Sequence, residues 1–395
     1  MPRKPVYLDW NASAPVRPEV AAAVAEAMTA TGNPSSVHGY GRAARRSIEV
    51  ARARVAALVG AEPSEIVFTS GGSEANSLAL RGVIAAALAS GQRFTRLFVS
   101  AIEHDSIAET AAVLVESIPG LRVVAIPVTG AGVVDLDALR TLMMEGKGRT
   151  LISVMLANNE TGALQPVAEI ARLAAEYGAV VHTDAAQAAG RIDVEMSRLG
   201  VHMMTLSAHK IGGPQGVGAL IVRGDVAIER QIAGGGQELG RRSGTENVAG
   251  IVGFGVAAKL ALETRDAWKT VATLRDRLET EALSRVPNAV VHARMTERLP
   301  NTTCLGVPGL AAETQVIALD LVGVAVSAGA ACSSGKVRAS RVLQAMGVSD
   351  DDAGSAIRVS LGPTTTDADV DTFLTAWTDH VKRASRVRHV RLAAG

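Results

Sequence analysis

The sequence predicts an α/β protein, with a large domain built on a mostly parallel sheet flanked by helices and a smaller α+β domain. Short apolar runs alternate with helical patterns over the first two thirds of the chain, which is typical of a parallel sheet covered on both faces. The 395 residues are long enough for two domains. A long helical stretch over 249–283 separates the two regions, and we place the boundary near residue 262. Residues 16–262 would then form the large domain, and 1–15 together with 263–395 the small one.

The composition is that of a globular chain, with 48% hydrophobic and 20% charged residues. A formal net charge of +1 gives no general attraction to nucleic acid or to an anionic membrane. The chain contains no 18-residue apolar run, and its first residues lack the apolar segment of a signal peptide. We therefore expect a cytoplasmic protein that binds neither nucleic acid nor membrane. Its two cysteines, Cys304 and Cys332, are expected as reduced thiols.

The N-terminal part predicts a short strand at 6–8 and helices at 21–28 and 43–59, the second of which ends at Gly60. The polar, turn-rich segment 31–39 between these helices contains Asn33. It is either a plain surface loop or a loop of the active site, because loops carry many ligand contacts.

A strand at 66–70 is followed by a glycine turn at 71–76 and a helix at 77–89. A helix N-terminus after such a turn can bind a phosphate, because its backbone N–H groups and the helix dipole favour an anion. The turn matches neither the dinucleotide nor the nucleoside triphosphate motif. By itself it indicates an anion site only weakly.

Further strands are predicted at 96–100, 123–126, 151–156 and 179–184, with a helix at 166–177. Polar residues stand at or just past the ends of three of them: His104, Asn159 and Asp184. Open α/β sheets bind their ligands at the carboxyl ends of the strands. His104 could equally be a surface residue that caps the next helix.

A glycine-rich loop between strands at 203–206 and 219–222 presents Lys210. A buried lysine can lose its proton and attack a carbonyl, which an arginine cannot do. Lys210 is therefore either a Schiff-base lysine for an aldehyde cofactor or a solvated loop residue. Its convergence with Asn159 and Asp184 at strand ends favours the first interpretation.

An aldehyde cofactor with a phosphate and a pyridine ring would find its partners among these residues. Asp184 could face the ring nitrogen, and His104 could lie over the ring and move protons. Four residues could form a phosphate cup: Gly72, Ser73, Ser207 and His209. Arg358 could pair with a substrate carboxylate, although a lone strand arginine is more often structural.

The last third predicts strands at 289–292, 302–307 and 356–361 and a basic, solvated helix face over 382–391. Two polar segments, 233–238 and 241–247, precede it. A loop of small residues at 326–336 carries Cys332, whereas Cys304 lies in an apolar strand and is expected to be a packed core thiol.

Six motifs, taken in order along nearly the whole chain, resemble those of the NifS/IscS-type cysteine desulfurases. That family belongs to the class V aminotransferase group and to fold type I of the pyridoxal-phosphate enzymes, so the resemblance implies a sheet of the seven-stranded type. The motifs are TSGGSEAN at 69–76, ANNETG at 157–162, HTDAAQ at 182–187, SAHK with its following glycines at 207–210, RSGTEN at 242–247 and the cysteine loop.

The resemblance implies pyridoxal 5'-phosphate as cofactor and L-cysteine as substrate. Lys210 would hold the cofactor as a Schiff base, Asp184 would pair with its pyridine nitrogen, and His104 would stack on its ring. The remaining roles that it implies are phosphate binding by Gly72, Ser73, Ser207, His209 and Thr245, contacts of Gln187 with the ring hydroxyl and of Asn159 with the cofactor, and binding of the substrate carboxylate by Arg358 and Asn33. Thr245 would come from the second subunit of a homodimer.

The resemblance makes Cys332 the nucleophile that takes sulfur from cysteine as a persulfide, leaving alanine. The sulfur would pass to an acceptor or scaffold protein of iron–sulfur cluster assembly. No metal site is expected, although Cys332 could ligate a cluster transiently. The sequence around it, GAACSS, differs from the family's GSACTS, and Ser73 replaces a common threonine.

Two alternatives stay open. The protein could be a selenocysteine lyase or another fold-type-I lyase or aminotransferase. It could also be a sulfur-relay scaffold that has no cofactor of its own.

Overall fold

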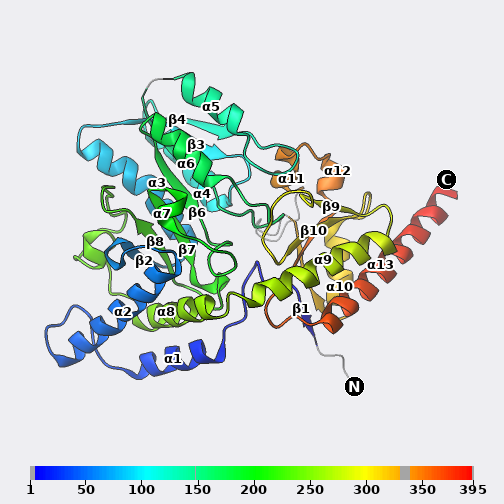
Figure 1. The fold of residues 1–395 in the computed structure, drawn as a ribbon, viewed down its shortest axis with the longest axis horizontal. Helices are drawn as coiled ribbons and strands as arrows, with labels where there is room; N and C mark the ends of the chain where they lie inside the picture. Colours follow the sequence, from blue (N-terminus) through cyan, green and yellow to red (C-terminus); the bar gives the residue numbers. More distant parts are fainter. Residues whose placement is uncertain (1–4, 147, 330–338, 394–395) are drawn as a thin grey trace.

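A computed structural model describes residues 5–146, 148–329 and 339–393. A seven-stranded sheet forms the centre of its larger part, in the order β2-β8-β7-β6-β5-β3-β4 (Figure 1). Strands β3 to β7 pair in parallel, whereas β8 runs antiparallel to both of its neighbours. The predicted α/β class and mostly parallel sheet are confirmed. The antiparallel strand arises because β7 and β8 are joined by the short Lys210 loop, which leaves no room for a crossover helix.

The elements of this larger part are, in chain order, α1 (Pro18–Thr29), α2 (Gly39–Leu58), β2 (Ile66–Thr69), α3 (Gly72–Ala89), β3 (Phe94–Ser100), α4 (Asp105–Ser117), β4 (Arg122–Ile126), α5 (Leu136–Met144), β5 (Arg149–Ser153), α6 (Val167–Glu176), β6 (Val180–Asp184), α7 (Met196–Leu199), β7 (Met203–Ser207), β8 (Gly218–Val222) and α8 (Val248–Glu263). Short 3₁₀ turns lie at Pro63–Glu65, Ala208–Lys210 and Glu238–Gly240.

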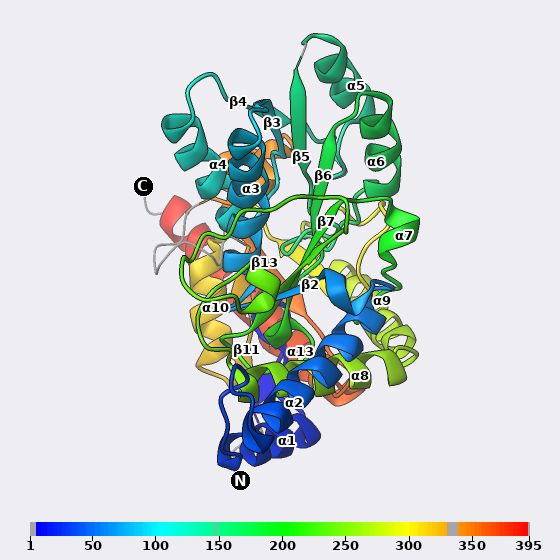
Figure 2. The same ribbon diagram turned by 90° about the vertical axis from the view of Figure 1, so that its left-hand side faces the viewer.

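Helices cover both faces of the sheet, with α3 and α4 on one side and α6 and α7 on the other (Figure 2). Side chains of successive strand residues point to opposite faces, so Met203 packs in the core under α3 and α4 while Met204 packs in the core under α2, α6 and α8. Both faces are apolar because both are buried.

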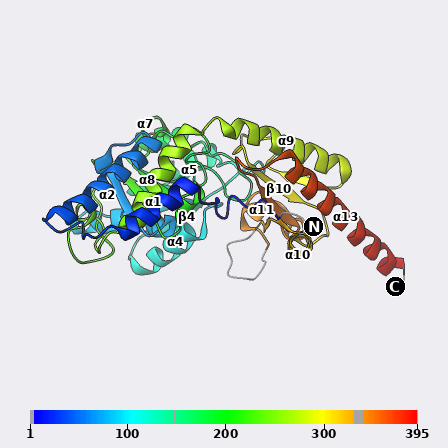
Figure 3. The same ribbon diagram turned by 90° about the horizontal axis from the view of Figure 1, so that it is seen from below.

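The rest of the chain is built on a four-stranded antiparallel sheet in the order β12-β13-β10-β9, and on a parallel pair of β1 and β11. Its elements are β1 (Val6–Tyr7), α9 (Ala267–Arg285), β9 (Val290–His292), β10 (Thr302–Gly306), α10 (Ala312–Asp320), β11 (Val324–Ala325), β12 (Ser327–Ala328), α11 (Arg341–Ala345), α12 (Asp350–Ala353), β13 (Ala356–Ser360) and α13 (Asp367–Ala393). Side chains of α9, α10 and α13 share one apolar core with this sheet, and Figure 3 shows these helices at the opposite end of the molecule from α1 and α2.

Two predicted helices differ from the structure. The stretch 249–283 is not continuous, because α8 ends at its C-cap residue Thr264 and α9 begins at Ala267. The division of the chain near residue 262 stays a prediction. Helix α3 begins at Gly72 rather than at residue 77. The first turn of a helix has no intrahelical partner for its N–H groups, so glycine is tolerated there although it weakens a helix interior.

None of the helices in the described part of the chain is long and apolar enough to cross a membrane.

Candidate active site

A cavity of ≈ 310 Å³ lies at the carboxyl ends of β6 and β7, beside the N-termini of α3 and α4. Most of the predicted site residues line it: Gly72, Ser73, His104, Asn159, Asp184, Gln187, Ser207, His209, Lys210 and Arg358. These residues come from positions up to 286 residues apart in the chain (72 to 358). The strand ends of the large sheet share one edge and bring most of them together, whereas Arg358 comes from β13 of the small sheet.

Lys210 ends the 3₁₀ turn between β7 and β8. Its Nζ donates to the backbone oxygen of Asn11 at 2.6 Å and to that of Ala12 at 3.0 Å. These two carbonyls belong to the N-terminal segment that follows β1, so the lysine is held inside the cavity rather than solvated at the surface.

Asp184 is the last residue of β6 and is 9% exposed. Its Oδ1 accepts from the backbone N–H of Ala186 at 2.9 Å, and its Oδ2 accepts from Asn76 Nδ2 at 2.7 Å. The first residue of the same motif, His182, points into the core, where it contacts Ser153 and Thr205 and where burial lowers its pKa to about 4. His182 and Asp184 are two residues apart and share one face of β6, so it is the position of Asp184 at the carboxyl end of the strand that distinguishes the site carboxylate from the structural histidine.

His104 is the N-cap residue of α4. Its Nδ1 accepts from the backbone N–H of Ser106 at 3.1 Å and lies 2.8 Å from the Ser106 hydroxyl. The ring also lines the cavity. The two interpretations of His104 from the sequence, a helix cap and a site residue, are therefore compatible, since the same histidine caps α4 and lines the cavity.

The other end of the cavity is suited to an anion. Gly72 and Ser73 form the first turn of α3, whose N-cap Gly71 provides no side-chain hydrogen bond to it. Ser207 and His209 approach from the end of β7. Burial, together with the charges of Lys210 and Arg191, lowers the pKa of His209 to about 4, so this imidazole is neutral at pH 7.

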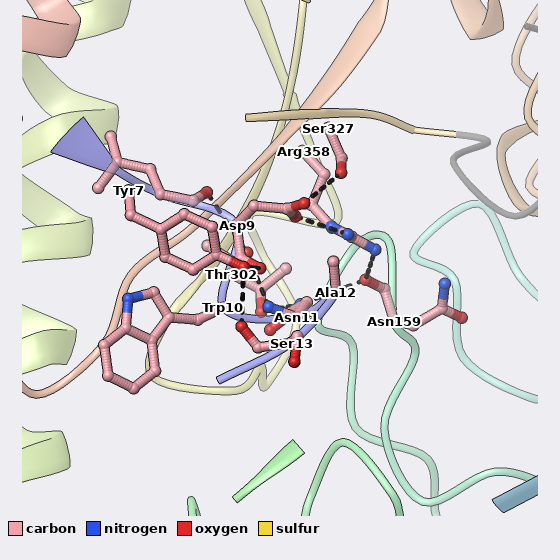
Figure 4. A network of polar contacts seen from close by, with 12 residues as sticks. Tyr7, Asp9, Trp10, Asn11, Ala12, Ser13, Asn159, Thr302, Ser327 and Arg358 are labelled. Atoms are coloured by element: carbon pink, nitrogen blue, oxygen red, sulfur yellow. Dashed lines mark hydrogen bonds and ion pairs between the residues drawn. The ribbon is translucent and has the colours of Figure 1, made fainter. Parts of the chain in front are cut away.

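Arg358 on β13 reaches the cavity from the small sheet (Figure 4). Its Nη2 forms an ion pair with Asp9 Oδ1 at 2.8 Å, and its Nη1 donates to the backbone oxygen of Asn159 at 3.2 Å. Ser327 donates to the other Asp9 oxygen. The Arg358 Nε is buried and finds no acceptor among the described residues. The contacts with Asp9 and Asn159 use two of the five guanidinium N–H groups, so donors remain for a ligand.

Asn11 connects the two sheets at this site, as Figure 4 shows. Its side chain donates to Asn159 O and to Thr302 Oγ1, and it accepts from Arg191 and from Asn301. Its backbone oxygen accepts from Gln187 Nε2 at 3.0 Å as well as from Lys210. Gln187 is thereby held with its amide edge against the N-terminal segment.

Two buried carboxyl groups lie beside the cavity. Burial, reinforced by the charge of Asp184, raises the pKa of Glu103 well above its usual value; its Oε1 accepts from the backbone N–H of Met155. Burial also raises the pKa of Glu160 to about 7. Glu160 Oε2 accepts from the Ser340 hydroxyl, which caps α11.

Three predicted site residues are not part of this cavity as described. Asn33 is exposed in its loop, where its side chain accepts from the backbone of Ser35. Thr245 is exposed and lines a separate pocket with Phe68 and Arg242. Cys332 lies outside the described residues.

Cys304 is fully buried, and burial raises the pKa of its thiol, which fits a packed core residue.

No role was predicted from the sequence for Asn11, Asn76 or Ser106. Asn76 belongs to the TSGGSEAN motif, and Ser106 lies two residues after His104, which were the only local signals. The partners of Asn76 and those of Asn11 lie far away in the chain.

The donor set suits pyridoxal 5'-phosphate. The cavity combines a lysine amine, a buried carboxylate, and a helix N-terminus with a hydroxyl and an imidazole. These groups match an aldehyde, a pyridine nitrogen and a phosphate. The buried Asn76 Oδ1 and Arg358 Nε have no partner within the described ranges, as expected for a site built around a polar ligand.

The chain matches the family model described as aminotransferase class-V over residues 6–373. A cysteine desulfurase of Cereibacter sphaeroides is 44% identical over 93% of this chain and 94% of that protein. A cysteine desulfurase IscS of Dictyoglomus turgidum is 40% identical over 93% of this chain and 92% of that protein. The structure of a NifS-like protein from Rickettsia africae gives a TM-score of 0.86 at 36% identity, covering 96% of this chain and 99% of that one. The structure of SspA in complex with cysteine gives a TM-score of 0.77 at 31% identity, covering 91% and 100%.

Proposed function

The chain belongs to the aminotransferase class-V family, and from this premise we propose that it is a pyridoxal-phosphate-dependent cysteine desulfurase. The resemblance read from its six motifs agrees with this membership. The observation that supports the activity most directly is the single cavity that collects Lys210, Asp184, His104 and Arg358. Its relatives named cysteine desulfurase cover nearly the whole chain.

We propose that Lys210, Asp184 and His104 hold the reactive part of the cofactor. Lys210 would bind its aldehyde, Asp184 its pyridine nitrogen and His104 its ring face. Gly72, Ser73, Ser207 and His209 would hold its phosphate, and Gln187 and Asn159 would contact its remaining edge. When bound, the cofactor supplies an electron sink next to the substrate.

The protein's own groups would bind and orient cysteine. Arg358 would hold the substrate carboxylate through its remaining guanidinium N–H groups, while Asp9 and Asn159 keep the guanidinium in place. Asn33 is proposed as a second carboxylate contact, which requires its loop to approach from outside the cavity. His104 would move protons at the substrate.

Cys332 is proposed as the nucleophile. Its thiolate would attack the sulfur of cysteine, so that a sulfur–sulfur bond forms on the enzyme, the carbon–sulfur bond breaks and alanine is left. The persulfide sulfur would then pass to an acceptor or scaffold protein, with iron–sulfur cluster assembly as the proposed destination and the cytoplasm as the proposed location.

A homodimer is part of the proposal. Thr245 would reach the phosphate of the cofactor in the second subunit, which fits its exposed position outside its own cavity. The buried Glu246 carboxylate beside it has no hydrogen-bond partner in the described part of this single chain, its nearest cation being Arg45 at 3.6 Å.

Incubation of the purified protein with L-cysteine tests the activity. We expect alanine in the solution and a persulfide on Cys332, detected by mass spectrometry of the alkylated peptide. The Cys332→Ala variant should produce neither, and Cys304→Ala, the matched control, should produce both. Alanine formed by Cys332→Ala at the normal rate would rule out the nucleophile role.

Absorbance tests the cofactor and the scaffold alternative. The protein as purified should carry the absorption band of a lysine-bound pyridoxal phosphate, and Lys210→Ala should lack it. A protein without the band, even after addition of the cofactor, would rule out the proposed enzyme and leave the scaffold alternative. Steady-state rates with selenocysteine and cysteine decide between a desulfurase and a selenocysteine lyase.

A further inference from the structure

We propose that Asn76 and Ser106 are positioning residues that link Asp184 to His104 and hold the His104 imidazole with its proton on Nε2. The inference rests on the proposed function only in taking Asp184 and His104 as contacts of the cofactor. It concerns a hydrogen-bond network that is present in the protein itself.

Asn76 lies in the first half of α3 and is 1% exposed. Its Nδ2 donates to Asp184 Oδ2 at 2.7 Å and to Ser106 Oγ at 2.9 Å. A carboxamide nitrogen carries two N–H bonds, and both are used here. The Asn76 Oδ1 accepts from none of the described residues, so the side chain serves as a double donor that joins β6 to α4.

Ser106 continues the network to the histidine. Its hydroxyl oxygen accepts from Asn76, so its own proton can be given to His104 Nδ1, which lies 2.8 Å away. The backbone N–H of Ser106 also donates to the same Nδ1 at 3.1 Å. A backbone N–H can only donate, so Nδ1 is an acceptor and carries no proton.

The neutral imidazole must then carry its proton on Nε2. A proton on Nδ1 would face the Ser106 backbone N–H, which is unfavourable. While the network is intact, the neutral His104 therefore presents an N–H donor at Nε2, and its lone pair stays on Nδ1, facing Ser106. The same Asn76 that sets this tautomer also orients the Asp184 carboxylate, so one amide aligns both groups.

The two arms of the network can be separated by substitution. Ser106→Ala removes the hydroxyl arm to His104 and leaves the Asn76–Asp184 bond in place. Ser106→Thr restores a hydroxyl at the same position. Asn76→Ala removes the bonds to Asp184 and to the Ser106 oxygen and leaves the Ser106 hydroxyl beside His104 Nδ1. Ser117→Ala is a matched control, because Ser117 lies on the same helix and, among the described residues, its hydroxyl donates to the Val113 carbonyl within that helix.

The test is ¹⁵N NMR of the histidine rings in cofactor-free protein, with the His104 signals assigned from a His104→Gln variant. In the wild type we expect Nδ1 unprotonated and Nε2 protonated. Ser106→Ala should raise the ratio of Nδ1-protonated to Nε2-protonated ring about fivefold, which corresponds to the loss of one hydrogen bond. Ser106→Thr should return the ratio to the wild-type value, and Ser117→Ala should leave it unchanged.

Binding of pyridoxal phosphate to the same proteins tests the second arm. Asn76→Ala should weaken binding at least about fivefold, because Asp184 loses a charge-assisted hydrogen bond. Ser106→Ala should leave the affinity near that of the wild type. Circular dichroism establishes that each variant is folded.

A wild-type ring protonated on Nδ1, or a tautomer ratio that Ser106→Ala leaves unchanged, would overturn the proposal. These two outcomes, the wild-type tautomer and its response to Ser106→Ala, are both measured on the ring nitrogens of the cofactor-free protein. They stay informative if the protein forms no alanine from cysteine, so failure of the network and failure of the proposed function are distinguishable.

Discussion

Buried charged groups surround the cavity, and each is stabilised by a different partner. Glu160 is 8% exposed, follows the site residue Asn159, and accepts from the Ser340 hydroxyl. Arg191 is 3% exposed and lies under the N-terminal segment, where its guanidinium donates to uncharged oxygens. Since both groups are removed from water, their contributions to stability depend on these few contacts.

The Glu160 carboxyl should make stability depend on pH. Burial raises its pKa in the folded protein from 4.5 to about 7. Between these values the folded state binds a proton that the unfolded state has released, so stability is present below pH 4.5 and falls as pH rises toward 7. The loss is on the order of 3 kcal/mol.

Glu160→Gln keeps an acceptor for Ser340 but cannot titrate. Relative to the wild type, this variant should become more stable as the pH is raised from 5 to 8, measured as the midpoint of urea unfolding. The exposed Glu109→Gln on α4 serves as control. Equal pH dependence in Glu160→Gln and wild type would show that another group is responsible.

Arg191 should matter for stability as well as for the site. Its acceptors are Asn11 Oδ1 at 2.7 Å, Gln187 Oε1 at 2.6 Å and the backbone oxygens of Trp10 and Lys210. Arg191→Ala leaves these buried acceptors without their donor, at a cost of about 3 kcal/mol in the free energy of unfolding. Thermal and urea unfolding measure this, with the exposed Arg172→Ala as a control expected within about 0.5 kcal/mol of the wild type. A similar small change in Arg191→Ala would contradict the prediction.

At the scale of elements, the start of β8 supports the turn that opens α3. A Cβ on Gly218 would lie 2.6 Å from the carbonyl carbon and 2.8 Å from the Cα of Gly71. Backbone atoms cannot move aside as the end of a flexible side chain can. Only glycine, which has no Cβ, therefore allows residue 218 to pack this closely against Gly71. The close packing places the N–H groups of the α3 first turn at the edge of the cavity.

Gly218→Ala should therefore displace the Gly71–Gly72 turn. We expect a loss of about 1–3 kcal/mol in stability and weaker binding of pyridoxal phosphate, because overpacking moves the backbone that would hold the phosphate. Calorimetric titration of the cofactor-free protein measures the affinity. Gly224→Ala adds a Cβ with nothing within 4 Å and should bind as the wild type does; an unchanged affinity in Gly218→Ala would disprove the role of this contact.

At the scale of the molecule, the segment after β1 joins the two sheets. Asn11 contacts Thr302 and Asn301 of the small sheet's side, and Asn159 and Arg191 on the side of the large sheet. Asp9 adds an ion pair to Arg358 on β13. The segment after β1, which belongs to neither the seven-stranded nor the four-stranded sheet, thus forms one boundary of the cavity.

Asn11→Ala should loosen this junction. It removes one acceptor from Arg191 Nη1, which keeps Gln187 Oε1, and one from Asn301 Nδ2, which keeps the Leu361 carbonyl. Together with the lost bonds that the Asn11 amide donates, this should cost about 3 kcal/mol in the free energy of unfolding. The Asn11 backbone oxygen remains to accept from Lys210, so the variant should still bind the cofactor when folded. Urea unfolding and cofactor absorbance measure the two effects. Loss of binding with normal stability would contradict this, and the exposed Asn288→Ala provides the control.

The sequence by itself determined the α/β class, the strand ends and most of the cavity. Lys210, Asp184 and His104 each follow a run of apolar residues, and the carboxyl ends of parallel strands meet at one edge. These conclusions depend on short-range patterns, which can be recognised from residues that are consecutive in the sequence. The same reasoning placed Arg358 correctly on a strand but could not separate a ligand-binding arginine from a structural one.

The tertiary structure alone decided which groups touch. Asn76 and Asn11 were not predicted because their partners lie 30 to 291 residues away and no periodicity marks them. Ser106 lies two residues from His104, but its link to Asn76 spans 30 residues. The antiparallel direction of β8 and the break between α8 and α9 likewise depend on packing between distant elements. A hydrogen bond requires atoms within about 3 Å, and only the folded chain sets that distance for residues so far apart in sequence.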